Sequence, residues 1–109
     1  RRVAVLGEML ELGEQGMRWH QECGRFATRA GVARLVTVGG PAARAMADAA
    51  VEAGLEAAAV THVATSLDAS DVVSGVLRPG DLVLVKGSRG VRMDVVVDRV
   101  RAERQESGH

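Results

Sequence analysis

Three polar side chains near the end of the sequence have the chemistry to bind an anion. Lys86 directly precedes Gly87, and Ser88 and Arg89 stand in a short turn between Gly87 and Gly90. An apolar run precedes this turn, and a stretch with the 3.6-residue period of a helix follows it. Two cations and a hydroxyl beside backbone N–H groups near a helix N-terminus suit a carboxylate or a phosphate. The alternative is an ordinary polar βα loop with solvated charges.

The type of one cation favours a binding role. The chain has 14 Lys and Arg residues, and Lys86 is the only lysine among them. A compact ammonium group at the end of an apolar strand therefore stands out from the arginines used elsewhere. A second polar loop carries the opposite charge, because Glu8 and Glu11 lie between Gly7 and Gly13.

The elements that hold these loops alternate along the chain. Alternating strands and helices predict right-handed crossovers and a mostly parallel sheet with helices on both faces, an α/β Rossmann-like fold. The simplest strand order is 3-2-1-4. Strands are expected at residues 3–6, 35–38, 57–63 and 81–85, and helices at residues 14–30, 41–53, 65–77 and 93–100.

This strand order makes a specific prediction about the two polar loops. The first and fourth strands become neighbours, so the Glu8 loop and the Lys86 loop line one crevice, while His62 lies two strands away. In the first helix, a stripe of Trp19, Cys23, Phe26 and Ala30 is expected to pack in the core. His20 beside that stripe is expected to be a hydrogen-bonded structural histidine.

Composition limits the classes of function. The 109 residues form one domain, with 47% hydrophobic and 26% charged residues. A net charge of +0 and 2% aromatic residues argue against nucleic acid or an anionic membrane as partners. A single cysteine, Cys23, allows no intrachain disulfide and makes the cytoplasm the default location. No apolar run approaches the roughly 20 residues of a membrane-spanning helix.

Known motifs narrow the possibilities further. The first strand is followed by no Gly-x-Gly-x-x-Gly, and no Walker sequence precedes Lys86. The three histidines are far apart and Cys23 is alone, so no metal site is expected from this chain. The opening Arg1-Arg2, directly before a strand, is expected of a domain cut from a longer protein. Residues 101–109 lose periodicity and are expected to be a frayed tail.

Several short motifs in combination resemble a known family. They are the loop at residues 5–13, His20 and Gly24 in the first helix, Val38-Gly39, Gly80-Asp81, and residues 85–90 with Met93. Over residues 2–100 this set resembles the C-terminal domain of the MurF family of Mur ligases. These are the UDP-N-acetylmuramoyl-tripeptide D-alanyl-D-alanine ligases of peptidoglycan synthesis.

The resemblance implies part of an ATP-dependent amide ligase. A central ATPase domain, absent from these 109 residues, would use ATP and Mg2+ to phosphorylate the carboxylate of UDP-MurNAc-tripeptide, and the amine of D-Ala-D-Ala would attack the acyl phosphate. Residues 1–100 would form a lid that closes over the central domain and excludes water. The isolated chain would be inactive and bind no cofactor alone, and the full enzyme would be a cytoplasmic monomer.

The resemblance also implies roles for single residues. Lys86, Gly87, Ser88 and Arg89 would bind substrate, with Arg89 holding the dipeptide carboxylate in a two-pronged pair. Glu8 and Glu11 would face the nucleotide or fix the cations of the neighbouring loop. The alternative, which the residues alone leave open, is a free-standing Rossmann-like module that binds a small anion or a protein partner.

Overall fold

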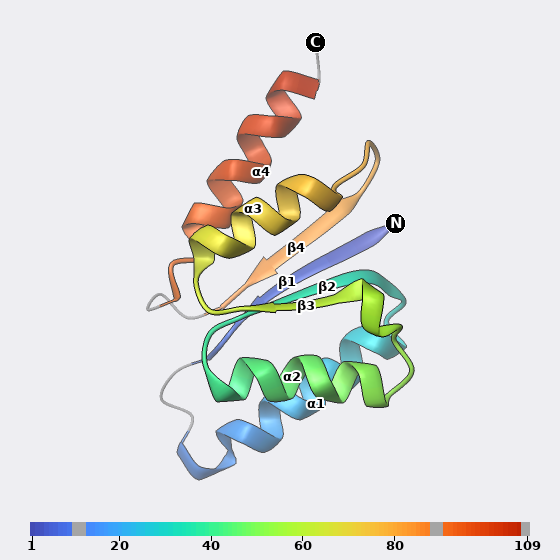
Figure 1. Ribbon diagram of the computed structural model, residues 1–109, viewed down its shortest axis with the longest axis vertical. Coiled ribbons are helices and arrows are strands. Elements are labelled where there is room, and N and C mark those ends of the chain that lie inside the picture. The colour runs from blue at the N-terminus through green and yellow to red at the C-terminus, as the bar shows by residue number, and fades with distance from the viewer. Residues whose placement is uncertain (10–12, 88–90, 108–109) are drawn as a thin grey trace.

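The computed structural model contains one four-stranded parallel sheet in the order β3-β2-β1-β4 (Figure 1). It describes residues 1–9, 13–87 and 91–107. Every strand pair is parallel, so the carboxyl ends of the strands meet at one edge of the sheet. The strands are β1 (Arg2–Gly7), β2 (Val32–Val38), β3 (Val60–Val63) and β4 (Leu82–Lys86).

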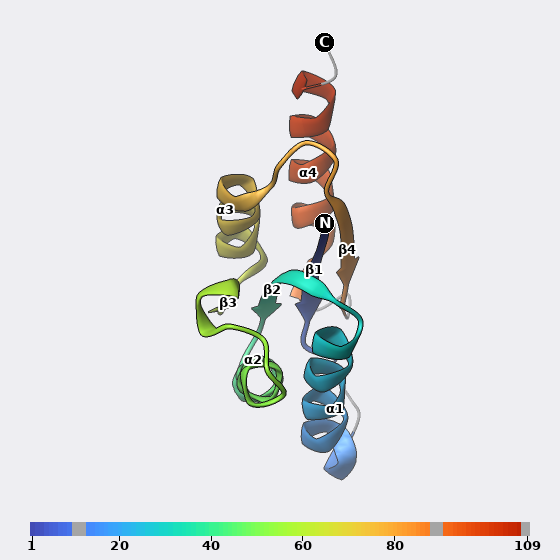
Figure 2. The same cartoon turned by 90° about the vertical axis from the view of Figure 1, so that its right-hand side faces the viewer.

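Four α-helices cover the sheet in two pairs. Figures 1 and 2 show α1 and α2 on one side of the sheet and α3 and α4 on the other. A cluster of valines with Met93 fills the space under α3 and α4, and Ala4, Leu35 and Ala50 pack under the opposite pair. The helices are α1 (Gly16–Arg29), α2 (Pro41–Glu52), α3 (Ser66–Val76) and α4 (Asp94–Ser107), with 3-10 turns η1 (Gly13–Gln15) and η2 (Ala57–Ala59).

The predicted fold class and strand order are confirmed, and three element boundaries differ. The second strand begins at Val32 rather than residue 35. The third strand begins at Val60 rather than residue 57, because the alanines before it form the turn η2. The last helix does not end near Val100 but continues to Ser107, so residues 101–107 of the expected tail are helical. This polar end of α4 projects beyond the rest of the molecule (Figure 1).

The predicted core stripe of α1 is wrong. The side chains of Trp19 and Phe26 are 49% and 65% exposed, and Cys23 is only half-buried. The buried residues of this helix are instead Gly16, His20, Gly24 and Ala27. Both stripes fit the helical period, and the smaller residues face inward because α1 packs closely against α2.

Gly24 marks the closest approach of these two helices. A Cβ atom at this position would lie 2.1 Å from the carbonyl oxygen of Met46 and 3.2 Å from the amide nitrogen of Ala50. Real Cβ atoms do not come so near to backbone atoms, so only glycine allows α1 and α2 to pack at this distance. Backbone proximity, rather than side-chain bulk, therefore decides which face of α1 is buried.

The expected cover of helices on both faces of the sheet is incomplete at the fourth strand. Leu82 and Leu84 are 67% and 57% exposed, whereas Val83 and Val85 pack on the cluster beneath α3 and α4. Successive side chains of a strand point to opposite faces, so the two leucines lie on the α1 side. In the described part of the chain, β4 is at the edge of the sheet and no helix covers this face of it.

A buried carboxylate joins the first residue to the turn before β4. The Nε atom of Arg1 donates to both carboxylate oxygens of Asp81, at 3.0 and 3.2 Å, and the backbone N–H of Arg78 donates to Oδ2 at 2.8 Å. These bonds to Arg1 and Arg78 favour the charged form, so the pKa of Asp81 lies below its usual value. The ion pair thus aligns the starts of the neighbouring strands β1 and β4.

We expect Asp81→Asn to lower the urea midpoint of unfolding at pH 7. Because the folded pKa of Asp81 is lowered, its contribution to stability is fully present above the unfolded pKa and is lost as pH falls through the folded value. The difference between the two proteins should therefore shrink below a pH of about 4. Urea unfolding from pH 3 to pH 7 measures it.

The matched control is Asp71→Asn, because this carboxylate forms an exposed pair with Arg99 at 3.4 Å. Such surface pairs contribute about 0 to 1 kcal/mol, so its midpoint should stay close to that of the wild type. A gap between wild type and Asp81→Asn that widens as the pH falls would contradict the ion-pair account.

Candidate functional site

The candidate site lies at the carboxyl edge of the sheet, where β1 and β4 end side by side. Leu6 of β1 pairs with Lys86 of β4. One residue further on, a Cβ atom on Gly87 would lie 3.0 Å from the Cα atom of Gly7 and 2.8 Å from Cγ of Met93. The two glycines thus let both segments leave the sheet in backbone contact. The prediction that the first and fourth strands are neighbours is confirmed, and the prediction that the Glu8 and Lys86 loops line one crevice stays a prediction.

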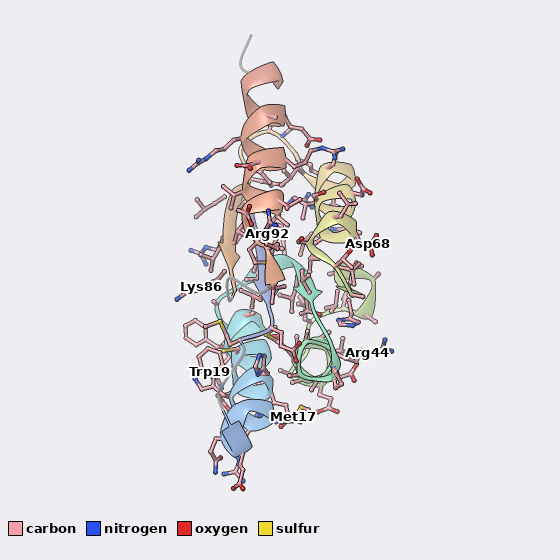
Figure 3. The ribbon with its side chains drawn as sticks, turned by 90° about the vertical axis from the view of Figure 1, so that its left-hand side faces the viewer. Met17, Trp19, Arg44, Asp68, Lys86 and Arg92 are labelled. Atoms are coloured by element: carbon pink, nitrogen blue, oxygen red, sulfur yellow. The ribbon has the colours of Figure 1, made fainter. Side chains whose placement is uncertain are left out.

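Lys86 is exposed at the end of β4, on the side of the sheet that carries α1. Figure 3 shows it on the same side of the molecule as Trp19. Burial raises the pKa of the Cys23 thiol on α1, and the positive charge of Lys86 opposes this shift. Ser88 and Arg89 lie outside the described residues, so the anion-binding role of residues 86–89 stays a prediction.

Glu8 turns toward α2. Its backbone N–H donates to the carbonyl oxygen of Val38 at 2.8 Å, and its Oε2 accepts from the backbone N–H of Gly40 at 2.9 Å. Gly40 is the N-cap of α2, so the carboxylate satisfies an N–H group that has no partner within the helix. Glu11 lies outside the described part of the chain, and its predicted role stays a prediction.

His20 is buried at 1% exposure, and both of its ring nitrogens have partners. Nδ1 lies 2.6 Å from the carbonyl oxygen of Gly16, and Nε2 accepts from the backbone N–H of Met9 at 2.9 Å. The expectation of a hydrogen-bonded structural histidine is therefore confirmed. Sequence reasoning missed its partner Met9, which lies in the segment that follows β1.

His62 lies away from this site, as predicted, because β3 is two strands from β1. Its Nδ1 is 3.1 Å from the hydroxyl oxygen of Thr37 on β2. Desolvation by burial is the main cause that lowers the pKa of His62, and the charge of Arg44 acts in the same direction. This pair faces α2 and does not join the segments that follow β1 and β4.

Arg92 and Asp94 form a pair at the start of α4 that sequence reasoning missed. Nε and Nη2 of Arg92 donate to the two carboxylate oxygens of Asp94, at 3.1 and 3.2 Å. Arg92 has a φ of 57°, in the left-handed region. The hydrogen bonds from Arg92 are the main cause that lowers the pKa of Asp94. An acidic residue in the first turn of a helix, two residues after an arginine, was the available signal.

Metal-binding groups, phosphate repulsion and membrane spans can be assessed for the described residues. Within residues 1–9, 13–87 and 91–107, no group of three or more His, Cys, Asp or Glu is arranged to hold a metal ion. The Glu8 carboxylate caps the N-terminus of α2, where it would repel a phosphate. None of the described helices is both long enough and apolar enough to cross a membrane.

Comparisons with known proteins identify the family. The family model described as "Mur ligase, glutamate ligase domain" matches residues 1–89. A UDP-N-acetylmuramoyl-tripeptide–D-alanyl-D-alanine ligase of Mycobacterium leprae is 41% identical over 99 residues, which are 90% of this chain and 19% of the relative. The ligase of the same name from Bacillus subtilis is 33% identical over 97 residues, or 89% of this chain and 21% of the relative. The chain thus spans about a fifth of these relatives.

Solved structures agree on the fold. A MurF ligase from Thermotoga maritima in complex with ADP matches with a TM-score of 0.73 and 22% identity, over 98% of this chain and 23% of that chain. MurF from Acinetobacter baumannii matches with a TM-score of 0.68 and 27% identity, over 89% of this chain and 21% of that chain. Since the family model covers residues 1–89 of 109, the chain belongs to the Mur ligase glutamate ligase domain family.

Proposed function

We propose that this chain is the C-terminal domain of an ATP-dependent ligase that adds D-Ala-D-Ala to UDP-MurNAc-tripeptide in peptidoglycan synthesis. The observation that carries this proposal is the 41% identity, over 90% of the chain, to a relative named for that activity. The chain covers only 19% of that relative, so the reaction itself needs residues outside these 109.

The work of this domain is that of a lid. The full enzyme would need ATP and Mg2+. Among the described residues, no group of three or more His, Cys, Asp or Glu could hold a metal ion, and the Glu8 carboxylate occupies the start of α2. Both ATP and Mg2+ would be held by the central ATPase domain. Residues 1–100 would close over that domain and keep water from the reactive acyl phosphate. The reaction would use a UDP-linked substrate and be driven by ATP, so we infer that it takes place in the cytoplasm. We also infer a monomeric enzyme.

The segment at the end of β4 would bind the incoming dipeptide. Lys86 is exposed at the carboxyl edge of the sheet, and Gly87 brings the chain against Gly7 of β1. Ser88 and Arg89 follow directly in the sequence. A guanidinium can hold the dipeptide carboxylate through two parallel hydrogen bonds, and an ammonium beside it adds charge. Glu11, after β1, would lie on the nucleotide side of this segment or fix its cations, whereas the Glu8 carboxylate is engaged at the start of α2.

The test of this function uses the full-length protein that contains this chain. ADP release is measured with ATP, Mg2+, UDP-MurNAc-tripeptide and D-Ala-D-Ala, and the amide product is identified by mass. We expect ADP and product in equal amounts, and neither when the dipeptide is omitted. Deleting residues 1–109 should abolish the product. Turnover that proceeds equally well without D-Ala-D-Ala, or that survives the deletion, would refute the proposal.

A further inference from the structure

We propose that His20 is a positioning residue whose Nε2 atom holds the segment after β1 in the place that the ligase reaction requires. The geometry stands by itself, and the consequence for catalysis rests on the function proposed above. His20 is on α1, while its partner Met9 is two residues beyond the end of β1. The bond therefore ties the segment after β1 to α1.

The two partners of His20 fix its tautomer. The carbonyl oxygen of Gly16 only accepts, so the ring proton must be on Nδ1, which lies 2.6 Å away. The backbone N–H of Met9 only donates, so Nε2 must offer its lone pair at 2.9 Å. Only a neutral imidazole with its hydrogen on Nδ1 satisfies both partners at once.

The two hydrogen bonds have different purposes. Gly16 is one turn before His20 in the same helix, so the bond from Nδ1 orients the ring within α1. The bond from Met9 to Nε2 joins α1 to a different part of the chain, 11 residues away in sequence. The first bond prepares the ring, and the second holds the segment.

A small displacement of the Met9 backbone would move the neighbouring residues that border the candidate site. Its neighbour Glu8 is bonded instead to Val38 of β2 and to Gly40 at the start of α2. Glu8 directly follows Gly7, whose Cα atom would lie 3.0 Å from a Cβ atom on Gly87. Glu8 is thus anchored to α2 and Met9 to α1, beside the end of β4 where Lys86 stands. Loss of the Met9 anchor is expected to shift this edge of the site.

Two substitutions of His20 distinguish its hydrogen bond to Met9 from its packing in the core. The amide oxygen of glutamine can reach the position of Nε2, so His20→Gln keeps an acceptor for Met9 and loses the donor to Gly16. The shorter asparagine reaches only the position of Nδ1, so His20→Asn keeps the donor and loses the acceptor. If His20 only filled space in the core, each substitution would lower the stability of the whole domain according to the volume lost, which is larger for asparagine.

The first measurement follows the amide of Met9 directly. The chain contains four methionines, so 15N-methionine labelling gives few amide signals to assign. We expect hydrogen exchange at Met9 to be about tenfold faster in His20→Asn than in wild type, and close to wild type in His20→Gln. The amide of Met46, in the buried face of α2, reports any general loss of stability. Equal exchange at Met9 in both variants, after correction by Met46, would overturn the proposal.

The second measurement uses the full-length ligase and the same pair of variants. Because the bond from Met9 to His20 ties this segment to α1, kcat/KM should fall about tenfold in His20→Asn and stay within about threefold of wild type in His20→Gln. Turnover that is equal in the two variants, while their Met9 exchange differs, would refute the catalytic part of the proposal. The activity of the wild type tests the proposed function separately, and Met9 exchange tests the tether even if that activity is absent.

Discussion

Gly24→Ala should destabilise the domain by about 3 kcal/mol, more than an ordinary surface change. The new Cβ atom would lie 2.1 Å from the carbonyl oxygen of Met46, which belongs to the backbone of α2 and cannot rotate away. The helices α1 and α2 must then separate, which opens space around Ala50 and Leu35. For a domain of this size the melting temperature should fall by roughly 15 °C. Thermal unfolding followed by circular dichroism measures it.

A second glycine in a helix provides the matched control. Gly75 is in α3, and a Cβ atom placed there would meet nothing within 4 Å. Alanine favours the helix by about 1 kcal/mol relative to glycine, so Gly75→Ala should raise the melting temperature. The same substitution is thus expected to act with opposite sign in α1 and α3. A Gly24→Ala protein as stable as wild type would show that α1 and α2 can move apart at little cost.

Replacing Arg89 with alanine in the full-length protein should lower kcat/KM for D-Ala-D-Ala. The expected loss of transition-state stabilisation is roughly 2 to 5 kcal/mol, the scale for losing one partner of a buried charge pair. Lys86→Ala should act in the same direction, because Lys86 is exposed at the end of β4 beside the start of the segment after β1. The KM for ATP should change little, since the predicted contact is with the dipeptide. Initial rates of ADP release at varied dipeptide concentration separate these effects.

Arg29→Ala is the control for charge alone. Arg29 is the last residue of α1, exposed and paired with Glu22 at 3.0 Å, at the end of the helix away from the candidate site. Its removal changes the net charge by the same amount and should leave the kinetics unaltered. If Arg89→Ala and Lys86→Ala also match the wild type, residues 86–89 are scaffold and other residues hold the dipeptide.

The sheet order was predictable because it depends on patterns that the sequence displays. Apolar runs alternate with helical periods, and the right-handedness of parallel crossovers leaves few arrangements of four strands. The start of α3 also follows a local pattern, because Thr65 and Asp68 have the spacing of a helix cap and the backbone N–H of Asp68 donates to the Thr65 hydroxyl at 3.1 Å. From this order the meeting of the segments after β1 and β4 followed directly.

The inward face of α1 was not predictable from hydrophobicity. Two stripes share the helical period, and bulk favoured the one with Trp19 and Phe26. The close approach of α1 to α2 favours the stripe with Gly24, and such a distance between helices is not encoded in any local pattern. Likewise, an apolar run does not reveal whether one or both faces of β4 are covered.

The contacts that shape the candidate site were hidden for a similar reason. Glu8 was expected to serve the nucleotide or the cations, and its carboxylate is found on the N-cap of α2, 32 residues away in sequence. The partner of His20 is a backbone N–H, which every residue except proline possesses, so residue types carried no signal for it. The sequence proposes residue types for the site, whereas the hydrogen bonds between segments are visible only in the three-dimensional structure.

The uncovered side of β4 affects how this chain behaves when it is concentrated. An outer strand presents unpaired N–H and C=O groups, and here Leu82 and Leu84 add an apolar surface beside them. Such a strand is a template for pairing with a strand of another molecule, and a lysine at its end weakens that tendency through charge repulsion. Lys86 stands at that end. The lysine that we propose to bind substrate therefore also stands where it opposes aggregation.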